Sequence, residues 1–319
     1  MAWSRTDKNN LPRVLVMMAT YNGAAWVRDQ IESILDQEDV DVTLRICDDR
    51  SNDGTYELCA RYADAFDSVI VTCNRANVGV AQNFMQMVYE DEAVGFDYYA
   101  FADQDDVWAQ DKLARAVRRI EQEPASAPVL YYSDVLNIDE NGGSYEISQF
   151  RGCERHKATV LVRNVVNGCA MVWNAALNDI VRSYRPATFP RLHDVWLHMA
   201  GCFCGEVVDD YDSVSVYRRI TGKNVVGRNQ TDVRDAAGLK ALARLALSRY
   251  ERASSAAARL FYDGYRAHLT DEGEQILREF VGYRSSLPAR VRIACSGRYW
   301  LPTPQMRLRM RVGFLLGFY

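Results

Sequence analysis

Features that mark several other protein classes are missing from this sequence of 319 residues. No apolar run approaches the ~18 residues of a membrane-spanning helix, and residues 1–13 hold no apolar stretch of signal-peptide length. The 8 Pro and 19 Gly are too few for a collagenous or low-complexity chain. The net charge of −4 argues against a general nucleic-acid binder, which needs a basic surface. These absences predict a globular, cytosolic protein that binds no nucleic acid.

The 8 cysteines are scattered, and none forms a C-x-x-C pair. Cys202 and Cys204 form a C-x-C, but four ligands at zinc-finger spacing are missing. We therefore interpret the cysteines as small apolar residues in a reducing compartment and assign them neither a metal nor a disulfide.

Common catalytic motifs are missing as well. The sequence has no G-x-G-x-x-G after its first strand, no G-x-x-x-x-G-K-[ST] and no G-x-S-x-G, which excludes dinucleotide, P-loop and serine-elbow sites. His193 and His198 are five residues apart, with no Glu between them, and so do not form H-E-x-x-H.

In the first half of the sequence, apolar runs of strand length alternate regularly with segments whose apolar residues have helical spacing. Strands are predicted at residues 13–19, 42–47, 69–73, 97–102 and 128–133, and helices at 24–35, 55–66, 80–89 and 112–121. Further strands are predicted at 160–166, 206–208 and 213–217, with a helical region over 232–283. Strands interleaved with helices predict an α/β fold with a mostly parallel sheet. Ligands bind such sheets beyond the carboxyl ends of the strands.

Polar and acidic residues follow each of the first four strands. The third strand is followed by an Asn-rich turn, and the others by Thr20-Tyr21-Asn22-Gly23, Asp48-Asp49-Arg50-Ser51 and Asp103-Gln104-Asp105-Asp106. Turn and capping chemistry explains either acidic cluster by itself. Two clusters at one sheet edge indicate a divalent cation, because Mg²⁺ and Mn²⁺ are held by one or two carboxylates plus substrate phosphates.

These residues, in this order, resemble family 2 glycosyltransferases of the GT-A fold. Besides the loops above, the matching residues are Asn77-Val78-Gly79 with Asn83, Asn167-Gly168-Cys169, His193-Asp194-Val195-Trp196, Tyr217-Arg218 and Asn224-Val225-Val226-Gly227. The D-Q-D-D-x-W form with a later H-D-x-W is similar to rhamnosyltransferases of bacterial cell-surface polysaccharides. The resemblance implies a catalytic domain over residues 1–230 and a helical, basic extension over 231–319.

The resemblance also implies roles for individual residues. Asp194 would be the catalytic base of an inverting transfer, and Asp105 with Asp103 would hold Mg²⁺ or Mn²⁺. The nucleotide sugar (dTDP or UDP) would contact Thr20, Tyr21, Asn22, Asp48, Asp49, Asn77, Gly79, Asn83, Asp103, Gln104 and Arg218. The acceptor, expected to be a lipid-linked oligosaccharide, would contact Asp106, Trp108, His193 and Trp196.

One departure from the family pattern concerns the metal. The related branch has a His shortly after Tyr-Arg, and here Tyr217-Arg218-Arg219-Ile220-Thr221-Gly222-Lys223 lacks it. If that His helps to hold the metal or the diphosphate in the related branch, this role would fall here to Thr221, Arg218, Arg219 or Lys223. Three alternatives stay open: a UDP-hexose donor, an inactive nucleotide-sugar-binding subunit, and a nucleotidyltransferase, although the last would need a basic Gly-rich loop after the first strand.

The end of the chain has no acidic residue. Residues 280–319 carry seven arginines, at positions 284, 290, 292, 298, 307, 309 and 311. Basic residues with aromatic and aliphatic neighbours suit an anionic membrane surface. We therefore expect peripheral attachment at the inner leaflet, against the alternative of a solvated basic face with a docked helix.

Overall fold

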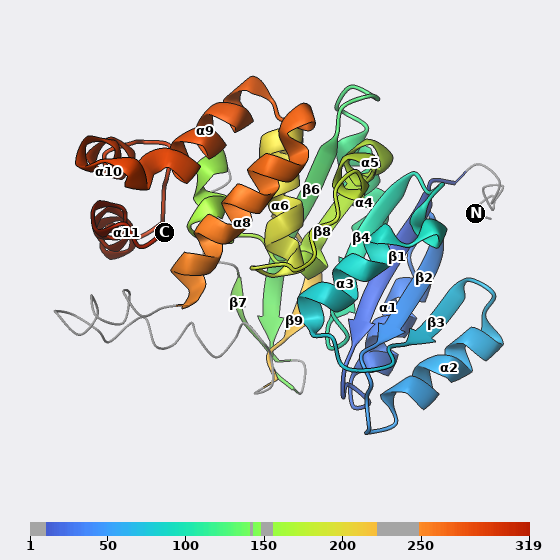
Figure 1. Cartoon of the computed structure of the whole chain (residues 1–319). Helices are drawn as coiled ribbons and strands as arrows, with labels where there is room; N and C mark the ends of the chain where they lie inside the picture. Colours follow the sequence, from blue (N-terminus) through green and yellow to red (C-terminus); the bar gives the residue numbers. More distant parts are fainter. Residues whose placement is uncertain (1–10, 141–142, 148–155, 222–248) are drawn as a thin grey trace.

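The computed structural model describes residues 11–140, 143–147, 156–221 and 249–319 (Figure 1). Several features of the sequence analysis lie outside these ranges. They are Lys223, the 224–227 motif, the expected domain boundary after residue 230 and the start of the predicted helical region.

A single sheet runs through the molecule in the order β3-β2-β1-β4-β8-β6-β9-β5, with β7 beside β6. The strands are β1 (Arg13–Thr20), β2 (Asp41–Asp48), β3 (Val69–Cys73), β4 (Tyr98–Ala102), β5 (Val107–Trp108), β6 (Val129–Ile138), β7 (Ser144–Ile147), β8 (Met171–Asn174) and β9 (Glu206–Arg219). The longer pairings, such as β1 with β2 and β6 with β9, are parallel. The antiparallel pairings of β5, β7 and β8 are short. The predicted α/β fold is confirmed.

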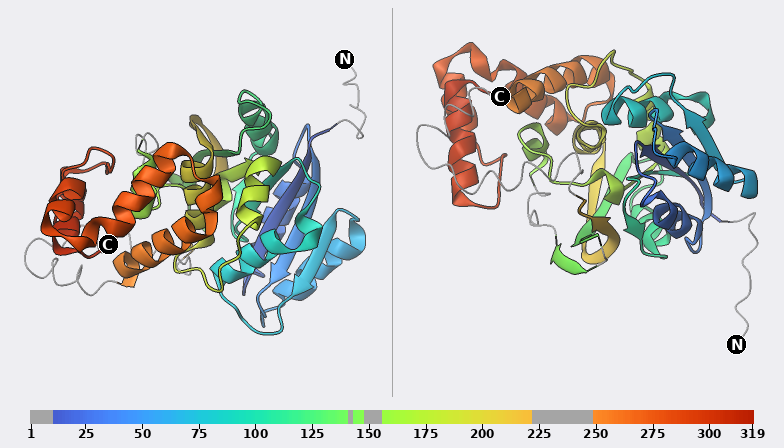
Figure 2. Two further views of the ribbon diagram at one scale, coloured as in Figure 1. Left: turned by 45° about the horizontal axis from the view of Figure 1, so that its top comes forward. Right: turned by 90° about the horizontal axis from the view of Figure 1, so that it is seen from below.

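Helices cover both faces of this sheet (Figures 1 and 2). On β1, Val14, Val16 and Met18 pack toward α1 (Val27–Leu35), α2 (Thr55–Ala65) and α4 (Lys112–Ile120). The alternate residues Leu15 and Met17 pack toward α3 (Val80–Tyr89), α5 (Ala175–Arg182) and α6 (His193–Cys204). Because β1 is buried on both faces, its residues form a continuous apolar run in the sequence. The four predicted helices of the first half are confirmed.

The second half of the sheet differs from the prediction. The strand expected at 160–166 is wrong: residues Lys157–Leu161 form a 3-10 helix, η3, that is buried beside α6. An apolar run indicates burial but does not by itself distinguish a strand from another buried segment. β8 was not predicted, and the strands expected at 206–208 and 213–217 form one strand, β9, with a register shift opposite Asp134.

Within the described residues 249–319, four α-helices form the C-terminal part: α8 (Arg249–Tyr265), α9 (Asp271–Gly282), α10 (Leu287–Ala294) and α11 (Pro304–Leu316). α8 packs on α6, where Phe261 and Tyr265 contact Trp196. The C-terminal helices therefore share a core with the sheet. Among the helices that the structure describes, none combines the length and the apolar composition that crossing a lipid bilayer requires.

Candidate functional site

The loops after β1, β2 and β4 are bonded together at one edge of the sheet. Thr20 Oγ1 donates a hydrogen bond of 2.9 Å to the Asp48 carboxylate. The Tyr21 N–H donates to Gln104 Oε1 at 2.9 Å, and Gln104 Nε2 donates to the Tyr21 carbonyl at 3.0 Å. The Asn22 N–H donates at 2.8 Å to a serine hydroxyl of the loop after β2. The structure thus brings together residues that the sequence placed after three different strands.

Gly23 allows the close contact between the loop after β1 and the loop after β4. A Cβ at this position would lie 2.2 Å from Gln104 Oε1. Any larger residue would therefore push Gln104 away from the Tyr21 backbone.

Asp48 is fully buried. Its carboxylate accepts from Thr20 and from both the N–H and the hydroxyl of Ser51, at 2.8 Å and 2.6 Å for the two Ser51 bonds. These bonds hold the Asp48 side chain inside the loop. Asp48 therefore fixes the conformation of the loop after β2 relative to the end of β1.

Asp49 organises the turn that precedes α3. Its carboxylate accepts from the N–H groups of Val78 and Gly79, each at 2.8 Å, and Asn77 Nδ2 donates to its carbonyl at 3.1 Å. Gly79 has φ +85°, a conformation that favours glycine. A carboxylate has about four acceptor positions. Asp49 could therefore accept a further hydrogen bond from a nucleotide base while it keeps its bonds to Val78 and Gly79.

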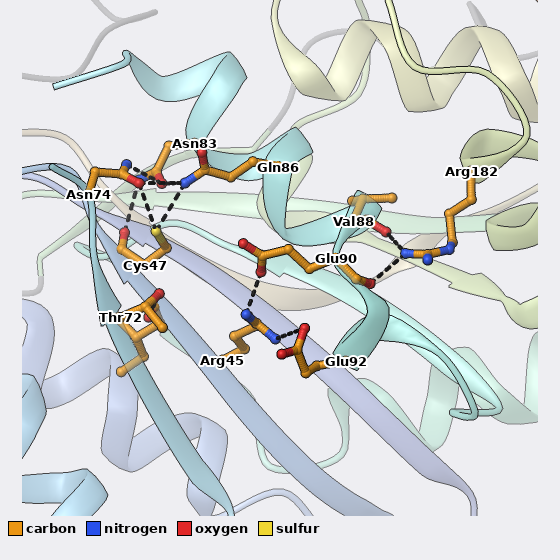
Figure 3. Close-up of polar contacts among 11 residues, drawn as sticks. Arg45, Cys47, Thr72, Asn74, Asn83, Gln86, Val88, Glu90, Glu92 and Arg182 are labelled. Carbon is orange, nitrogen blue, oxygen red and sulfur yellow. Dashed lines mark hydrogen bonds and ion pairs between the residues drawn. The ribbon is translucent and has the colours of Figure 1, made fainter. Parts of the chain in front are cut away.

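Asn83 lies in a polar network beneath this turn, drawn in Figure 3. It is buried, its Nδ2 donates to the Cys47 carbonyl at 2.9 Å, and its Oδ1 accepts from Asn74 at 3.0 Å and Gln86 at 3.1 Å. Its contact with the nucleotide sugar stays a prediction. Its amide is bonded to protein groups and fixes α3 to the end of β2.

Three carboxylates crowd the loop after β4. Burial is the largest cause that raises the pKa of each, and the charge of Asp103 adds to the effect on both Asp105 and Asp106. The pKa of Asp105 is raised to about 6. Such a cluster is stabilised by a cation, either a metal ion or a basic side chain.

A candidate metal-ligating group lies here. Among the described residues, Asp103, Asp106 and Cys169 offer one ligand atom each, and these atoms lie within 4.8 Å of one another. The Asp106 Oδ2 atom is buried without a hydrogen-bond partner. Carboxylates suit Mg²⁺ and Mn²⁺, and a sulfur ligand suits softer ions, so the set fits Mn²⁺ better than Mg²⁺. The sequence predicted Asp103 as a metal ligand together with Asp105, and it predicted no metal at Cys169.

Arg218 faces this cluster, and its charge lowers the pKa values of Asp103, Asp105 and Asp106. Arg219 has a different environment. Its backbone N–H donates to Asp106 at 3.1 Å, and its guanidinium bonds the Asp105 carbonyl and pairs with Asp29 at 3.1 Å. Arg219 is thus occupied in holding the loop, which leaves Arg218 as the better candidate to meet a diphosphate.

Asp194, in the first turn of α6, is buried near the cluster. It accepts from the Val195 N–H at 2.7 Å and from Asn164 Nδ2 at 2.8 Å. Burial raises the pKa of Asp194 to about 6, and the charge of Asp103 contributes in the same direction. A carboxylate with such a pKa suits proton transfer near neutral pH.

Gly168 links Asp194 to the candidate metal group. A Cβ here would lie 2.9 Å from His193 Nε2 and 3.2 Å from the Asp194 Cβ. The next residue, Cys169, belongs to the group with Asp103. The Asn167-Gly168-Cys169 motif therefore holds the acidic loop close to the start of α6.

Three residues predicted to contact the acceptor have covered side chains. His193 is buried, its ring stacks on Phe84 at 3.9 Å, and burial lowers its pKa to about 3. The ammonium group of Lys112 lies over the Trp108 ring, 3.8 Å from its centroid. The Trp196 ring N–H donates a hydrogen bond to the Tyr265 hydroxyl. Both tryptophan rings pack in the core, so the acceptor contacts expected for Trp108 and Trp196 stay predictions.

The sequence did not predict that Asn164 contacts Asp194, nor that Cys169 lies beside Asp103 and Asp106. Asn164 joins two groups of α6, since it donates to Asp194 and its Oδ1 lies 3.1 Å from His198 Nδ1. No spacing rule connects position 164 to position 194. The signal for Cys169 was present in the N-G-C motif.

The charges of the acidic loop predict a stability effect. Asp105→Asn should raise the melting temperature of the ligand-free protein at pH 7 by about 2–4 °C. The folded-state pKa of Asp105 is about 6, above its ordinary 3.8. The Asp105 carboxyl therefore costs the wild type stability as pH rises from about 4 to about 6, and the variant lacks this share of the loss.

Thermal unfolding at several pH values tests this prediction. Asp111→Asn is the matched control, because Asp111 pairs with Arg115 outside the cluster. A melting-temperature difference between Asp105→Asn and wild type that is the same at pH 4 and pH 7 would contradict it.

Residues 15–181 match the family described as Glycosyl transferase family 2. The dTDP-rhamnosyl transferase RfbG of Shigella flexneri is 37% identical over 102 residues, which cover 31% of this chain and 35% of that protein. The chain matches 35–40% of the length of its curated relatives.

Among solved structures, TarS 1-349 of S. aureus matches with a TM-score of 0.57 and 13% identity, over 95% of this chain and 80% of that chain. The same protein in complex with UDP-GlcNAc matches with a TM-score of 0.58 and 14% identity, over 96% of this chain and 82% of that chain. At this identity the likeness concerns the fold, and it supports the fold class predicted from the sequence.

Proposed function

Because the chain belongs to glycosyl transferase family 2, we propose that it is an inverting GT-A enzyme that transfers L-rhamnose from dTDP-β-L-rhamnose to a hydroxyl of a lipid-linked glycan. The observation that carries this proposal is the placement of Asp194 beside the Asp103 cluster. A buried carboxylate and an acidic loop thereby lie close together, which supports a base beside a diphosphate-binding edge. The reaction would serve cell-surface polysaccharide synthesis.

The base and ribose of the donor are assigned to the bonded loops after β1 and β2. Thr20, Tyr21 and Asn22 come from the first of these loops, and Asp48 and Asp49 from the second, and hydrogen bonds join the two loops. Asn77 and Gly79 are assigned to the same part of the donor, because both are bonded to Asp49. The similarity to RfbG, whose name includes dTDP-rhamnosyl, favours this donor.

The diphosphate is assigned to the acidic loop and Arg218. Asp103, with Asp106 and Cys169 or with Asp105, would hold Mg²⁺ or Mn²⁺. When bound, the ion would supply Lewis-acid stabilisation of the leaving diphosphate. Arg218 faces the same carboxylates and would neutralise part of the diphosphate charge directly.

Asp194 is assigned the proton transfer. Its carboxylate would take the proton of the acceptor hydroxyl while that oxygen forms a bond to the anomeric carbon. The bond from this carbon to the diphosphate breaks, and the nucleotide diphosphate leaves with the electron pair. A single displacement inverts the anomeric centre, so a β-linked donor yields an α-glycoside.

A panel of nucleotide sugars tests the donor. Purified protein is mixed with a short lipid-linked acceptor, with and without EDTA, and nucleotide release is measured. We expect dTDP release from the rhamnose donor and a strong reduction by EDTA. UDP release from a hexose donor would instead support the UDP-hexose alternative. No release from any donor, together with binding of dTDP by calorimetry, would indicate an inactive nucleotide-sugar-binding subunit.

A lipid-linked acceptor would place the enzyme at the cytoplasmic face of the cell membrane. The arginines of residues 280–319 support this location by charge.

A further inference from the structure

The C-terminal helices α10 and α11 present apolar side chains to solvent. They pack on each other at the end of the molecule opposite α2 and β3 (Figures 1 and 2). On α11, Leu308 is 65% exposed and Leu316 is 50% exposed. On α10, Leu287 is 66% exposed and Val291 is also exposed. Large leucines with this exposure on two adjacent helices are a candidate docking surface.

The exposed leucines of α11 form one stripe. Leu308, Leu315 and Leu316 follow the i, i+7, i+8 spacing of a single helix face. Arg309 and Arg311 are exposed and flank this face on its two sides, about 100° and 60° from Leu308 at the helical period. We call Leu308, Leu315 and Leu316 the α11 stripe.

The opposite face of α11 is firmly packed. Phe314 and Met310 are buried, and Phe314 contacts the rings of Tyr283 and Tyr299 at 5.4 Å and 5.0 Å. The Tyr283 hydroxyl donates to the carbonyl of the last residue, Tyr319, at 2.6 Å. The helix is thus held in place by one apolar face while a second apolar face stays open.

Charge decides which occupant this surface fits. Residues 280–319 hold seven arginines and no acidic residue, so a second copy of the chain would bring like charges together. An anionic lipid surface attracts the arginines and accepts the leucines among its headgroups and acyl chains.

We propose that the α11 stripe, with Leu287 and Val291 of α10, is a membrane-docking surface for anionic lipid. The proposal rests on the proposed function in that the lipid-linked acceptor lies in the same membrane. It goes further by assigning the contact to two defined helix faces rather than to basic charge in general.

Vesicle flotation of the full chain tests this surface. Wild type should float with vesicles of phosphatidylcholine containing about one third phosphatidylglycerol and stay behind with phosphatidylcholine alone. Leu308→Ser with Leu316→Ser should weaken partitioning at least about ten-fold. Arg309→Gln with Arg311→Gln should weaken it about five-fold per arginine at low salt.

Matched controls change equally exposed residues elsewhere. Val94→Ser, in the connection before β4, and Arg61→Gln, on α2, should float like wild type. Circular dichroism and thermal unfolding check that each variant is folded.

Three results would overturn the proposal: no flotation of wild type, flotation unchanged in both surface variants, and a dimer in solution that Leu308→Ser dissociates. Transfer to a water-soluble acceptor separates this proposal from the proposed function. Surface variants that lose flotation and keep transfer support both. Flotation without any sugar transfer leaves the surface standing and removes the function.

Discussion

Replacing Asp194 with Asn should lower kcat for sugar transfer by about 10²–10⁴-fold, with little change in the KM for the donor. The amide cannot take the acceptor proton at neutral pH. The donor contacts proposed for the loops after β1, β2 and β4 do not involve Asp194, so donor affinity should persist. Single-turnover transfer with saturating donor, and donor binding by calorimetry, measure the two effects separately.

The matched control is Asp179→Asn, which removes an exposed carboxylate from α5. It should retain wild-type kcat. Full turnover by Asp194→Asn would remove Asp194 from the mechanism and require another base.

The wild-type rate should also depend on pH in a defined direction. The pKa of Asp194 is raised to about 6 by burial. A general base works in its deprotonated form, so kcat should be constant above that value and fall toward ten-fold per pH unit below it. A rate that does not change down to about pH 4.5 would contradict the assignment.

Replacing Asp103 with Asn should lower kcat/KM for the donor by about 10²–10³-fold. Asp103 is the one carboxylate common to the Asp103–Asp105 pair predicted from the sequence and to the group with Asp106 and Cys169. The substitution replaces one oxygen of the proposed metal-ligating carboxylate with an amide nitrogen, and it removes a charge that raises the pKa values of Asp105 and Asp106. The affinity for Mn²⁺, measured by calorimetry without donor, should fall in parallel.

Asp111→Asn again serves as a control of equal charge change outside the cluster. Unaltered Mn²⁺ affinity in Asp103→Asn would show that any ion is held elsewhere. If EDTA leaves wild-type transfer unchanged, Arg218 becomes the main source of positive charge for the diphosphate.

Local patterns were enough to predict the parallel half of the sheet and its helices. β1 is buried on both faces, so its apolar run is long and unbroken, and the helices behind it repeat with the helical period. The polar residues after each strand were also predictable as a group, because parallel strands end at the same edge.

The amino-acid sequence by itself determined the family, the sheet edge that carries the site and the chemistry of its acidic loop, since these depend on residue types at short spacing. Only the tertiary structure decided which side chains are available. Asn83 and Trp196 satisfy motif positions yet are occupied by protein contacts, whereas Cys169 lies beside Asp103 across 66 positions of chain. Burial and pairing between distant segments arise from the packing of the whole chain, and no local pattern encodes them.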